Sequence, residues 1–554
     1  MGRSRLVAGP NPAGGPSLNS SQDTYPPITR RGILKAVAAG AGAAALAPLR
    51  AFAQPQALAP PQALAFQTKS AGPAVKVFDV LKYGAAGDGT TLDSAAFQRA
   101  IDEASAYAGK AQVLVRGGHK YLVGTIQLKG SIDFHLADDA QLLVSTRRED
   151  YLGGLAGTVA GDTMAASLGG VIVATGTQGL KISGTGTLQG RAKEFMTRYD
   201  QAGEWWIPGP FRPKMFVLTQ CKDLEVRDIT FAEAPNWGLH LLGCDGVLVD
   251  NVKVRNLLDV PNCDGIDPDH SRNIEIRNCN LVCGDDGVVL KCSRQPVDYG
   301  ECSNIHVHDC TIETQDAGLK IGTETTSDIH DIHFERCQIK TSSRGLCIQL
   351  RDEGNIYNID YRDITLHSRF YAAPWWGRGE AVSFTAIPRT PTTKLGSLHH
   401  ITATNIACTA ENSIRVCGSG ATDDGSVGSR IHDVTLDRVS ITLARTTQYK
   451  GGLFDNRPTT VAEPGSISNS MAGTISSTKI DPQAPSGIVQ HDTPGFSVEH
   501  ADNVTLRNCK VAWGPNPPDS FTYAVEAKDA TGLKIQGLTG GPAHTSLGKA
   551  VSIS

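Results

Sequence analysis

Acidic side chains gather in one stretch of the sequence, at a spacing that suits acid–base chemistry. Asp264 stands in the segment Asn-Cys-Asp-Gly-Ile-Asp, and Asp285 and Asp286 stand in the segment Cys-Gly-Asp-Asp that follows. Carboxylates held close together push the pKa of one of them upward. One protonated and one ionised carboxyl is the pair that cleavage of a glycosidic bond needs. These three aspartates are therefore the candidate catalytic residues. Asp267 and Asp269 are expected to cap the turn or hold loops.

A repeating pattern must bring these aspartates together. Short runs of Ile, Val or Leu alternating with polar residues recur about every 20–30 residues, as at Leu224–Val226, Val247–Val249, Ile274–Ile276 and Ile305–Val307. Period-2 strands that recur at this interval are typical of a stacked coil. Stacking places residues one coil apart side by side, about 4.8 Å apart. The sequence therefore predicts an all-β solenoid with the three carboxylates on one patch.

Composition excludes several other classes of protein. The chain has 554 residues with 59 glycines, 6% aromatic residues and 19% charged residues, which favours many short strands and turns over a helical bundle or a disordered chain. Lys and Arg number 52 against 56 Asp and Glu, so a strongly basic nucleic-acid binder is excluded.

The open first coil of a stack needs a cover, and the sequence supplies one within a cap of about residues 75–110. Ala96, Phe97, Ala100, Ile101 and Ala104 follow helical spacing and predict an amphipathic helix. The glycine-rich stretch 84–90 before it is interpreted as a tight turn, because no Gly-Lys-Ser/Thr follows. A low-complexity stretch, about 459–485, is expected to be a surface loop between late coils.

The first 53 residues resemble an export signal. Arg30 and Arg31 precede an Ala-rich stretch and Ala51-Phe52-Ala53, which predicts a twin-arginine signal peptide over 1–53 and periplasmic or secreted localisation. Residues 54–74 are then a linker, and 75–554 form one catalytic domain. Cleavage after Ala53 would change the formal charge from −4 to −9. A monomer is expected, with no nucleic-acid partner and no membrane contact after cleavage.

Thirteen cysteines are present, and their spacing matches no zinc site. Four of them follow strands at the same offset and are expected to be small interior residues: Cys279, Cys310, Cys337 and Cys509. Cys292 and Cys302 flank an expected loop and are the best disulfide candidate. No metal and no organic cofactor is implied.

Taken together, these motifs resemble glycoside hydrolase family 28, the polygalacturonase family. The resemblance starts at 83–90 (Tyr-Gly-Ala-Ala-Gly-Asp-Gly-Thr), continues through Pro-Asn-Trp at 235–237 and includes both acidic segments, 262–267 and 283–286. It implies a right-handed parallel β-helix, the pectin lyase-like solenoid, and inverting hydrolysis. In that scheme Asp285 is the general acid, whereas Asp264 and Asp286 hold and deprotonate the attacking water.

Two departures from the family pattern concern the substrate. Asp316 stands where the family has a histidine that assists the acid, and Cys347-Ile348-Gln349 replaces an Arg-Ile-Lys segment that holds a galacturonate carboxylate. Strand alternation directs Lys320 and Lys291 outward, and Arg351 follows in the next turn. We expect at least one of these cations to line the cleft; Asp316 and Gln349 are further candidate substrate-binding residues.

Aromatic residues offer a second set of candidate contacts. The segment Trp375-Trp376-Gly-Arg378-Gly-Glu380 lies in an expected loop, where exposed rings stack on sugars and Arg378 and Glu380 bind hydroxyls. The alternative is a loop that packs its tryptophans against the coil. Trp205 and Trp206 form a similar pair with weaker support, and His240 is interpreted as structural.

Three functions remain open at this point. The first is hydrolysis of pectin-type polysaccharide, either polygalacturonan or rhamnogalacturonan. The second is a β-helix polysaccharide lyase or epimerase, which needs a cation and a base at the reacting carbon. The third is a glycan-binding β-helix without catalysis. The expected partner in each case is a polysaccharide or oligosaccharide.

Overall fold

The computed structural model describes residues 75–152, 169–420, 428–459, 466–468 and 485–554. All of these belong to the second of two compact units, Pro61–Ser554. The expected signal peptide, the linker and nearly all of the low-complexity stretch lie outside the described residues. None of the described helices is both long and apolar enough to cross a membrane.

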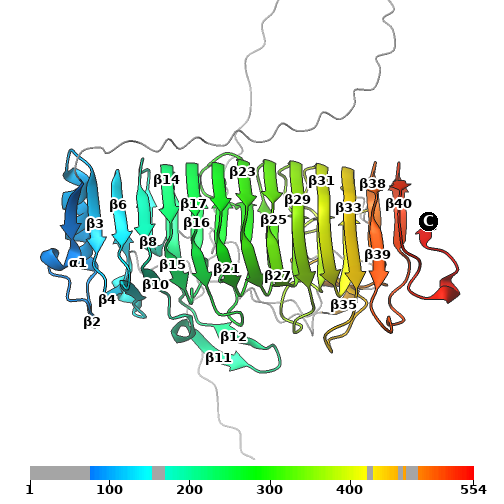
Figure 1. Cartoon of the computed structure of the whole chain (residues 1–554), viewed down its shortest axis with the longest axis horizontal. Helices are drawn as coiled ribbons and strands as arrows, with labels where there is room; N and C mark the ends of the chain where they lie inside the picture. Colours follow the sequence, from blue (N-terminus) through cyan, green and yellow to red (C-terminus); the bar gives the residue numbers. More distant parts are fainter. Residues whose placement is uncertain (1–74, 153–168, 421–427, 460–465, 469–484) are drawn as a thin grey trace, which may run out of the picture. The chain divides into compact units, whose positions relative to one another are not determined.

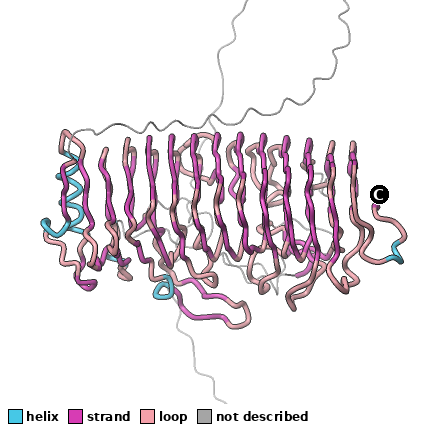
Figure 2. The backbone as a smooth tube through the Cα atoms, in the orientation of Figure 1, coloured by secondary structure: helices cyan, strands magenta, loops and turns pink. Residues whose placement is uncertain are grey.

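Parallel strands stack coil upon coil into three ladders, A, B and C (Figures 1 and 2). Ladder A contains β5 (Ile126–Gln127), β8 (Gly170–Thr175), β13 (Lys214–Thr219), β16 (Leu239–Leu242), β19 (Ile266–Asp269), β22 (Val288–Cys292), β25 (Ala317–Thr325), β28 (Arg344–Leu350), β30 (Glu380–Ala386), β32 (Asn412–Cys417), β37 (Phe496–Asp502), β40 (Val525–Thr531) and β42 (Val551–Ile553).

Ladders B and C complete each coil. Ladder B contains β1 (Lys76–Asp79), β3 (Ala111–Val115), β6 (Ile132–Leu136), β9 (Lys181–Gly184), β14 (Lys222–Arg227), β17 (Asp245–Asp250), β20 (Arg272–Arg277), β23 (Cys302–His308), β26 (Ile329–Glu335), β38 (Thr505–Arg507) and β41 (Lys534–Gln536). Ladder C contains β2 (Asp88–Leu92), β4 (Lys120–Val123), β7 (Gln141–Val144), β10 (Thr187–Gln189), β15 (Thr230–Ala232), β18 (Lys253–Arg255), β21 (Asn280–Cys283), β24 (Thr311–Thr314), β27 (Gln338–Ser342) and β39 (Lys510–Trp513). Three long strands run through both: β29 (Ile356–Ser368), β31 (Leu398–Ala410) and β33 (Ile431–Leu443).

A few elements lie outside the ladders. They are the hairpin β11 (Met196–Asp200) and β12 (Trp205–Pro208), the small sheet of β34 (Leu453–Asp455), β35 (Ser466–Ser468) and β36 (Pro485–Gln490), the helix α1 (Ser94–Ala106), and the short 3₁₀ segments η1 (Val80–Tyr83), η2 (Arg148–Asp150), η4 (Ala192–Phe195) and η6 (Thr545–Leu547).

The register of ladder B confirms the predicted repeat. Leu224 pairs with Val247, Val247 with Ile274, and Ile274 with Ile305, so the apolar residue of each repeat stacks on its counterpart. All four side chains are buried in one continuous apolar interior. The predicted all-β, right-handed parallel β-helix is confirmed.

Asparagines at the turns hold the coils in register. Asn251 and Asn278 adopt left-handed backbone conformations with φ of 55° and 54°. The side-chain amide of Asn251 donates to Asp228 and that of Asn278 to Asp250, both at 2.8 Å and both in the preceding coil. Asn tolerates this conformation better than most residues, which explains its recurrence at these positions.

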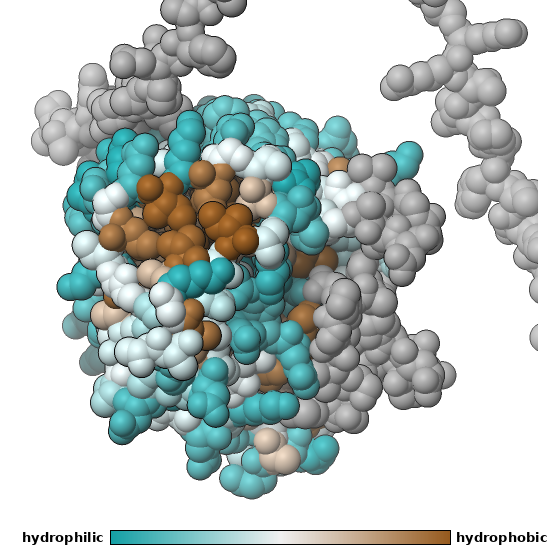
Figure 3. Space-filling model, turned by 90° about the vertical axis from the view of Figure 1, so that its right-hand side faces the viewer, coloured by the Kyte–Doolittle hydropathy of each residue, from teal (hydrophilic) through white to brown (hydrophobic). Residues whose placement is uncertain are grey.

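Helix α1 covers the first coil, and its buried face consists of the five residues predicted from their spacing. Phe97 packs edge-to-face on Tyr121 with ring centroids 5.3 Å apart. In the turn before the helix, the amides of Ala86 and Gly87 donate to the carboxylate of Asp93, so they are not free to bind a phosphate. The opposite end of the stack exposes apolar side chains (Figure 3). Ile553 in β42, the last strand of ladder A, is 62% exposed.

All thirteen cysteines are buried, and none forms a disulfide. Cys279, Cys310, Cys337 and Cys509 are interior residues, as predicted. The candidate disulfide between Cys292 and Cys302 is not formed, because both thiols are free.

We therefore expect no thiol of the native protein to react with an alkylating reagent. After unfolding without reductant, thirteen alkyl groups should be added, because the thiols are shielded by burial and not by oxidation. Mass spectrometry before and after unfolding measures both numbers. An unfolded protein that accepts thirteen groups only after reduction would contradict the free-thiol state.

Candidate active site

The three predicted catalytic aspartates meet at the start of neighbouring strands in ladder A. Asp264 comes two residues before β19, and Asp286 comes two residues before β22. Because Ile266 pairs with Val288, the two carboxyl groups lie on adjacent coils of the same face, with Asp285 beside them. One oxygen from each of the three lies within 4.8 Å of the others, and all three side chains are buried.

Each carboxylate of this cluster has different partners. The Lys320 ammonium lies 2.8 Å from Asp286, and the Lys291 ammonium lies 3.9 Å from Asp264. Asp285 instead accepts backbone N–H groups, from Asn262 at 2.9 Å and from Asp286 at 3.0 Å. Within the described residues no cation pairs with Asp285, so its neutral form is favoured over that of Asp286.

Burial and nearby charges also make the pKa of Asp285 higher than that of Asp286. Burial, followed by the charge of Asp264, raises the pKa of Asp285 well above its ordinary value. Burial also raises the pKa of Asp286, but Lys320 opposes it and the pKa is about 6. The proton of the cluster is therefore favoured on Asp285 over Asp286.

Asp267 is a fourth member of the cluster. It was expected to cap a turn or hold a loop, but it faces Asp264 instead, and the two carboxyl groups interact through a side-chain hydrogen bond. Burial raises its pKa to about 7, and burial together with Asp267 raises the pKa of Asp264. Apart from that contact, Asp264 Oδ1 and both Asp267 oxygens have no hydrogen-bond partner among the described residues. A water or a sugar hydroxyl can hydrogen-bond to the oxygens that this contact leaves open.

Asp269 and His240 form the supporting layer behind the cluster. Asp269 accepts the backbone N–H of Ser293 at 2.9 Å, which fixes the loop after β22 as expected. His240 is fully buried between Asp269 and Lys214, at 3.1 Å from each. Burial, followed by the Lys214 charge, lowers its pKa to about 4, so this histidine is neutral. This packing supports the structural interpretation of His240.

Two lysine ammonium groups lie over the ring of Trp237. Lys214 lies 4.4 Å from the ring centroid and Lys291 lies 4.7 Å from it. Such cation–π contacts are strengthened when the cation is desolvated. The ring therefore helps to hold Lys291 against Asp264. Neither Trp237 nor Lys214 was predicted to contact the site.

The candidate substrate residues fall into two groups. Asp316, Lys320 and Lys291 lie at the cluster. Gln349 and Arg351 do not reach it. Gln349 donates to the carbonyl of Arg457 at 3.1 Å, and Arg351 is fully buried while donating to two backbone carbonyls. The expectation that Arg351 could face the cleft is thus wrong, because the segment 455–457 closes over it.

The aromatic segment also differs from the expectation of exposed rings. Trp375 is fully buried against Trp205, with ring centroids 6.0 Å apart. Trp376 is half-buried, with the Arg457 guanidinium 4.8 Å from its ring centroid. Arg378 and Glu380 are buried and bind backbone groups. The alternative expectation was a loop that packs its tryptophans against the coil. The burial of Trp375, Arg378 and Glu380 agrees with this alternative.

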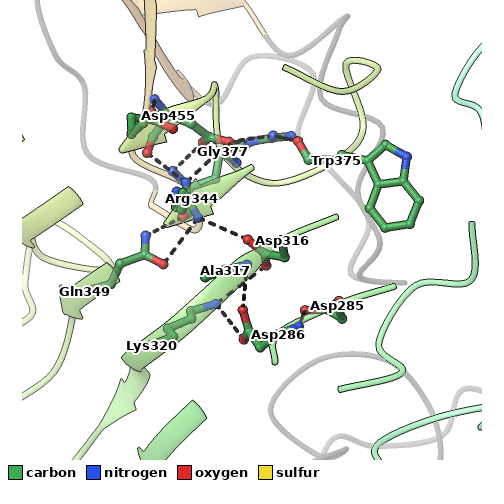
Figure 4. A network of polar contacts seen from close by, with 12 residues as sticks. Asp285, Asp286, Asp316, Ala317, Lys320, Arg344, Gln349, Trp375, Gly377 and Asp455 are labelled. Carbon is green, nitrogen blue, oxygen red and sulfur yellow. Dashed lines mark hydrogen bonds and ion pairs between the residues drawn. The ribbon is translucent and has the colours of Figure 1, made fainter. Parts of the chain in front are cut away.

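Sequence reasoning missed Arg344, which is almost fully buried beside the cluster (Figure 4). Its guanidinium lies 3.7 Å from Asp316 and 3.5 Å from Asp455. Arg344 stands at the start of β28, one coil beyond Ala317. Stacking alone could have placed it near the site, whereas Asp455 is too distant in sequence for that argument.

A polar pocket of about 380 Å³ opens beside the cluster. Glu324 connects the two, because it lines the pocket and pairs with Lys291 at 3.3 Å. The other lining residues are polar or charged: Arg294, Thr326, Asp352, Glu353, Arg389, Thr392, Thr393 and Lys394. Such a lining suits a ligand rich in hydroxyl and carboxylate groups.

In the part of the chain that the structure describes, two groups of side chains are close enough to share a cation. One is the aspartate cluster itself, in which Lys320 and Lys291 already supply positive charge. The other comprises His491, Glu499 and Glu526 on late coils, where the ammonium of Lys528 lies 2.6 Å from Glu526. In both groups a lysine already provides the charge that a metal would bring.

Comparison with known proteins gives a family match. The model of glycosyl hydrolases family 28 matches residues 125–450. A probable polygalacturonase of Vitis vinifera is 31% identical over 224 residues, covering 38% of this chain and 43% of that protein. An exopolygalacturonase of Zea mays is 24% identical over 277 residues, covering 46% and 63%. The chain thus spans about half the length of the curated relatives it matches.

Two solved structures share the fold. A hyperthermoactive exopolygalacturonase from Thermotoga maritima superposes with a TM-score of 0.53 at 20% identity, covering 66% of this chain and 87% of the other. A family 28 exopolygalacturonase of Yersinia enterocolitica gives 0.54 at 15% identity, covering 84% and 78%.

Proposed function

The chain belongs to the glycosyl hydrolases of family 28, and from that premise we propose that it hydrolyses glycosidic bonds in a pectin-type polysaccharide. The observation that carries the proposal is the asymmetry of the cluster. Asp285 is buried and forms no ion pair within the described residues, whereas Asp286 is paired with Lys320. The first carboxyl can donate a proton while the second accepts one.

The reaction follows from this asymmetry. Asp285 gives its proton to the glycosidic oxygen as the bond from that oxygen to the anomeric carbon breaks. A water oxygen bonds to the anomeric carbon, and Asp286 accepts the proton that the water loses. Asp264, whose Oδ1 has no partner among the described residues apart from the neighbouring Asp267 carboxyl, orients the water. Water is consumed and two shorter chains result, one of them with a new reducing end.

Inversion at the anomeric carbon is part of the proposal and comes from the family resemblance. The aspartate oxygens lie within 4.8 Å of one another, closer than the roughly 6.5–9.5 Å usual for an inverting pair. The distance therefore does not predict the stereochemistry. Proton NMR of the first product formed would report the configuration of the new reducing end before it mutarotates.

The substrate is proposed to be polygalacturonan or rhamnogalacturonan. Relatives named polygalacturonase and exopolygalacturonase support the first. The family's cationic Arg-Ile-Lys segment is replaced by Cys347-Ile348-Gln349, which favours a less charged sugar at the reacting position. The charged pocket beside Glu324 offers another place for a uronate.

The test is incubation of the protein with each polymer in the presence of EDTA, with reducing ends counted. A double variant, Asp264→Asn with Asp286→Asn, controls for contaminating activity. Reducing ends formed only by the unaltered protein support hydrolysis. An unsaturated product absorbing in the near ultraviolet would replace the proposal with a lyase, and binding without any product would replace it with a glycan-binding protein.

The proposal extends to location and assembly. Arg30 and Arg31 before the Ala-rich segment support export by the twin-arginine route to the periplasm or the medium, where a monomer would act on cell-wall pectin. Replacing both arginines with lysine should retain the protein in the cytoplasm, and light scattering measures its mass in solution.

A further inference from the structure

A row of alternating charges connects the aspartate cluster with Asp455 in β34 (Figure 4). Lys320 lies 2.8 Å from Asp286 and 3.6 Å from Asp316, and Arg344 lies 3.7 Å from Asp316. Arg344 in turn lies 3.5 Å from Asp455. The row therefore alternates strictly in sign, from Asp286 at the site to Asp455 in β34.

Every member of this row is buried, and Lys320 is the most exposed at 6%. Charges in such a position are screened little by water, so each one acts strongly on its neighbours. Lys320 has two carboxylate neighbours, one of which is the proposed base. Its ammonium is consequently divided between Asp286 and Asp316.

We propose that Lys320 is a positioning residue that keeps Asp286 ionised, and that Asp316 weakens this effect by competing for the same ammonium. This inference rests on the proposed function in one respect, because it takes Asp286 to be the catalytic base. Arg344, anchored on Asp455, fixes Asp316 in place on the side away from Asp286.

Asp286 has few other partners in the described residues, and Asp316 also repels its charge directly. The second oxygen of Asp286 accepts only the backbone N–H of Ala317, at 3.3 Å, so Lys320 is its nearest cation in the described residues. Several charged or titratable groups face Asp286 and Lys320 or their partner Asp316 from the elements packed against them: Asp264, Asp267, Asp285, Lys291, Asp316, Glu324, Arg344 and Cys347. Lys291 acts in the same direction as Lys320, and the aspartates oppose both.

Opposite shifts in two variants follow from this geometry. Lys320→Gln removes the cation, so the pKa of Asp286 should rise by about 1–3 units. Asp316→Asn removes the competing carboxylate, so the pKa of Asp286 should fall. The acid limb of kcat/KM reports an essential base, hence it should move to higher pH in the first variant and to lower pH in the second. General damage to the fold cannot move one limb in both directions.

The experiment measures pH profiles of kcat/KM for both variants, for Lys320→Arg and for Lys340→Gln. Lys340 lies exposed on β27 and serves as the matched control, with no shift expected. Lys320→Arg keeps the cation and should keep the limb within a few tenths of a unit. A lower rate at every pH with an unmoved limb, or shifts of the same sign in Lys320→Gln and Asp316→Asn, overturns the inference.

A second measurement is independent of turnover. The carboxyl resonance of ¹³C-labelled aspartate that disappears in Asp286→Asn reports the pKa of this group directly. If the unaltered protein cleaves no polymer but the resonance shifts as expected, the proposed function fails while this inference holds. If hydrolysis occurs and Lys320→Gln leaves the resonance unmoved, the inference fails and the proposed function holds.

Discussion

Asp285→Asn should lower kcat by about 10²–10⁴-fold, the usual contribution of a general acid. Asparagine has nearly the same shape and can still accept the backbone N–H of Asn262, now made at 2.9 Å to the carboxylate. It cannot give a proton to the leaving oxygen. Counting reducing ends released per enzyme at substrate saturation measures the loss, and circular dichroism verifies that the fold is unchanged.

Two further readouts distinguish loss of the acid from general damage. The high pKa of Asp285 should produce the basic limb of the wild-type pH profile, and this limb should vanish in the variant. The matched control is Asp298→Asn, an exposed aspartate in the loop after β22, which should retain full activity. A loss below tenfold, or an unchanged basic limb, would remove Asp285 from the role of acid.

The fold was predictable because its determinants are local and repeat. Each coil needs an apolar residue at the same interior position, which is occupied by Leu224, Val247, Ile274 and Ile305. The pattern therefore recurs along the sequence and predicts the stack. The asparagines at the turns recur for a similar reason, since each must adopt a left-handed conformation and bond to the coil before it.

The aspartate cluster was predictable for the same reason. Asp264 and Asp285 are about one coil apart, and stacking converts that separation into proximity. Strand alternation likewise directed Lys320 and Lys291 to the correct face. Asp267 was misjudged because a period-2 pattern shows which face a residue lies on, but not which of its neighbours provide hydrogen bonds.

Predictions failed where distant segments cover the coil. Trp375 and Arg351 stand in positions that an isolated coil would expose. The hairpin β11–β12 supplies Trp205 against Trp375, and Asn456 accepts a hydrogen bond from Arg351 at 2.6 Å. No periodic signal connects residues more than a hundred positions apart, so burial by such insertions cannot be read from the repeat.

The second large effect is expected at Asp455, which ties one of these covering segments to the site. Asp455→Asn should destabilise the protein by about 3–5 kcal/mol, because removing one partner leaves buried charges uncompensated. The carboxylate is fully buried and lies 2.7 Å from Arg457, 3.5 Å from Arg344 and 3.9 Å from Arg378. Urea unfolding followed by tryptophan fluorescence measures the free energy of unfolding.

The pH dependence of this loss has a definite sign. Burial opposes ionisation of Asp455, but Arg457 and Arg344 outweigh it and hold its pKa well below the ordinary value. A carboxyl with a depressed pKa stabilises the fold above its unfolded pKa, about 3.9, and loses that contribution as the pH falls further. The difference between the two proteins should therefore be complete at neutral pH and shrink below about pH 4.

An exposed ion pair provides the matched control for Asp455. Asp309 pairs with Arg336 at 2.9 Å, and both side chains are more than a third exposed. Asp309→Asn should cost at most about 1 kcal/mol, because solvent screens such a pair and asparagine suits its left-handed backbone. If both variants lost the same free energy of unfolding, burial of Asp455 would not increase its contribution to stability. A loss at Asp455 that stays constant below pH 4 would show that shape, and not charge, holds the segment 455–457 over the site.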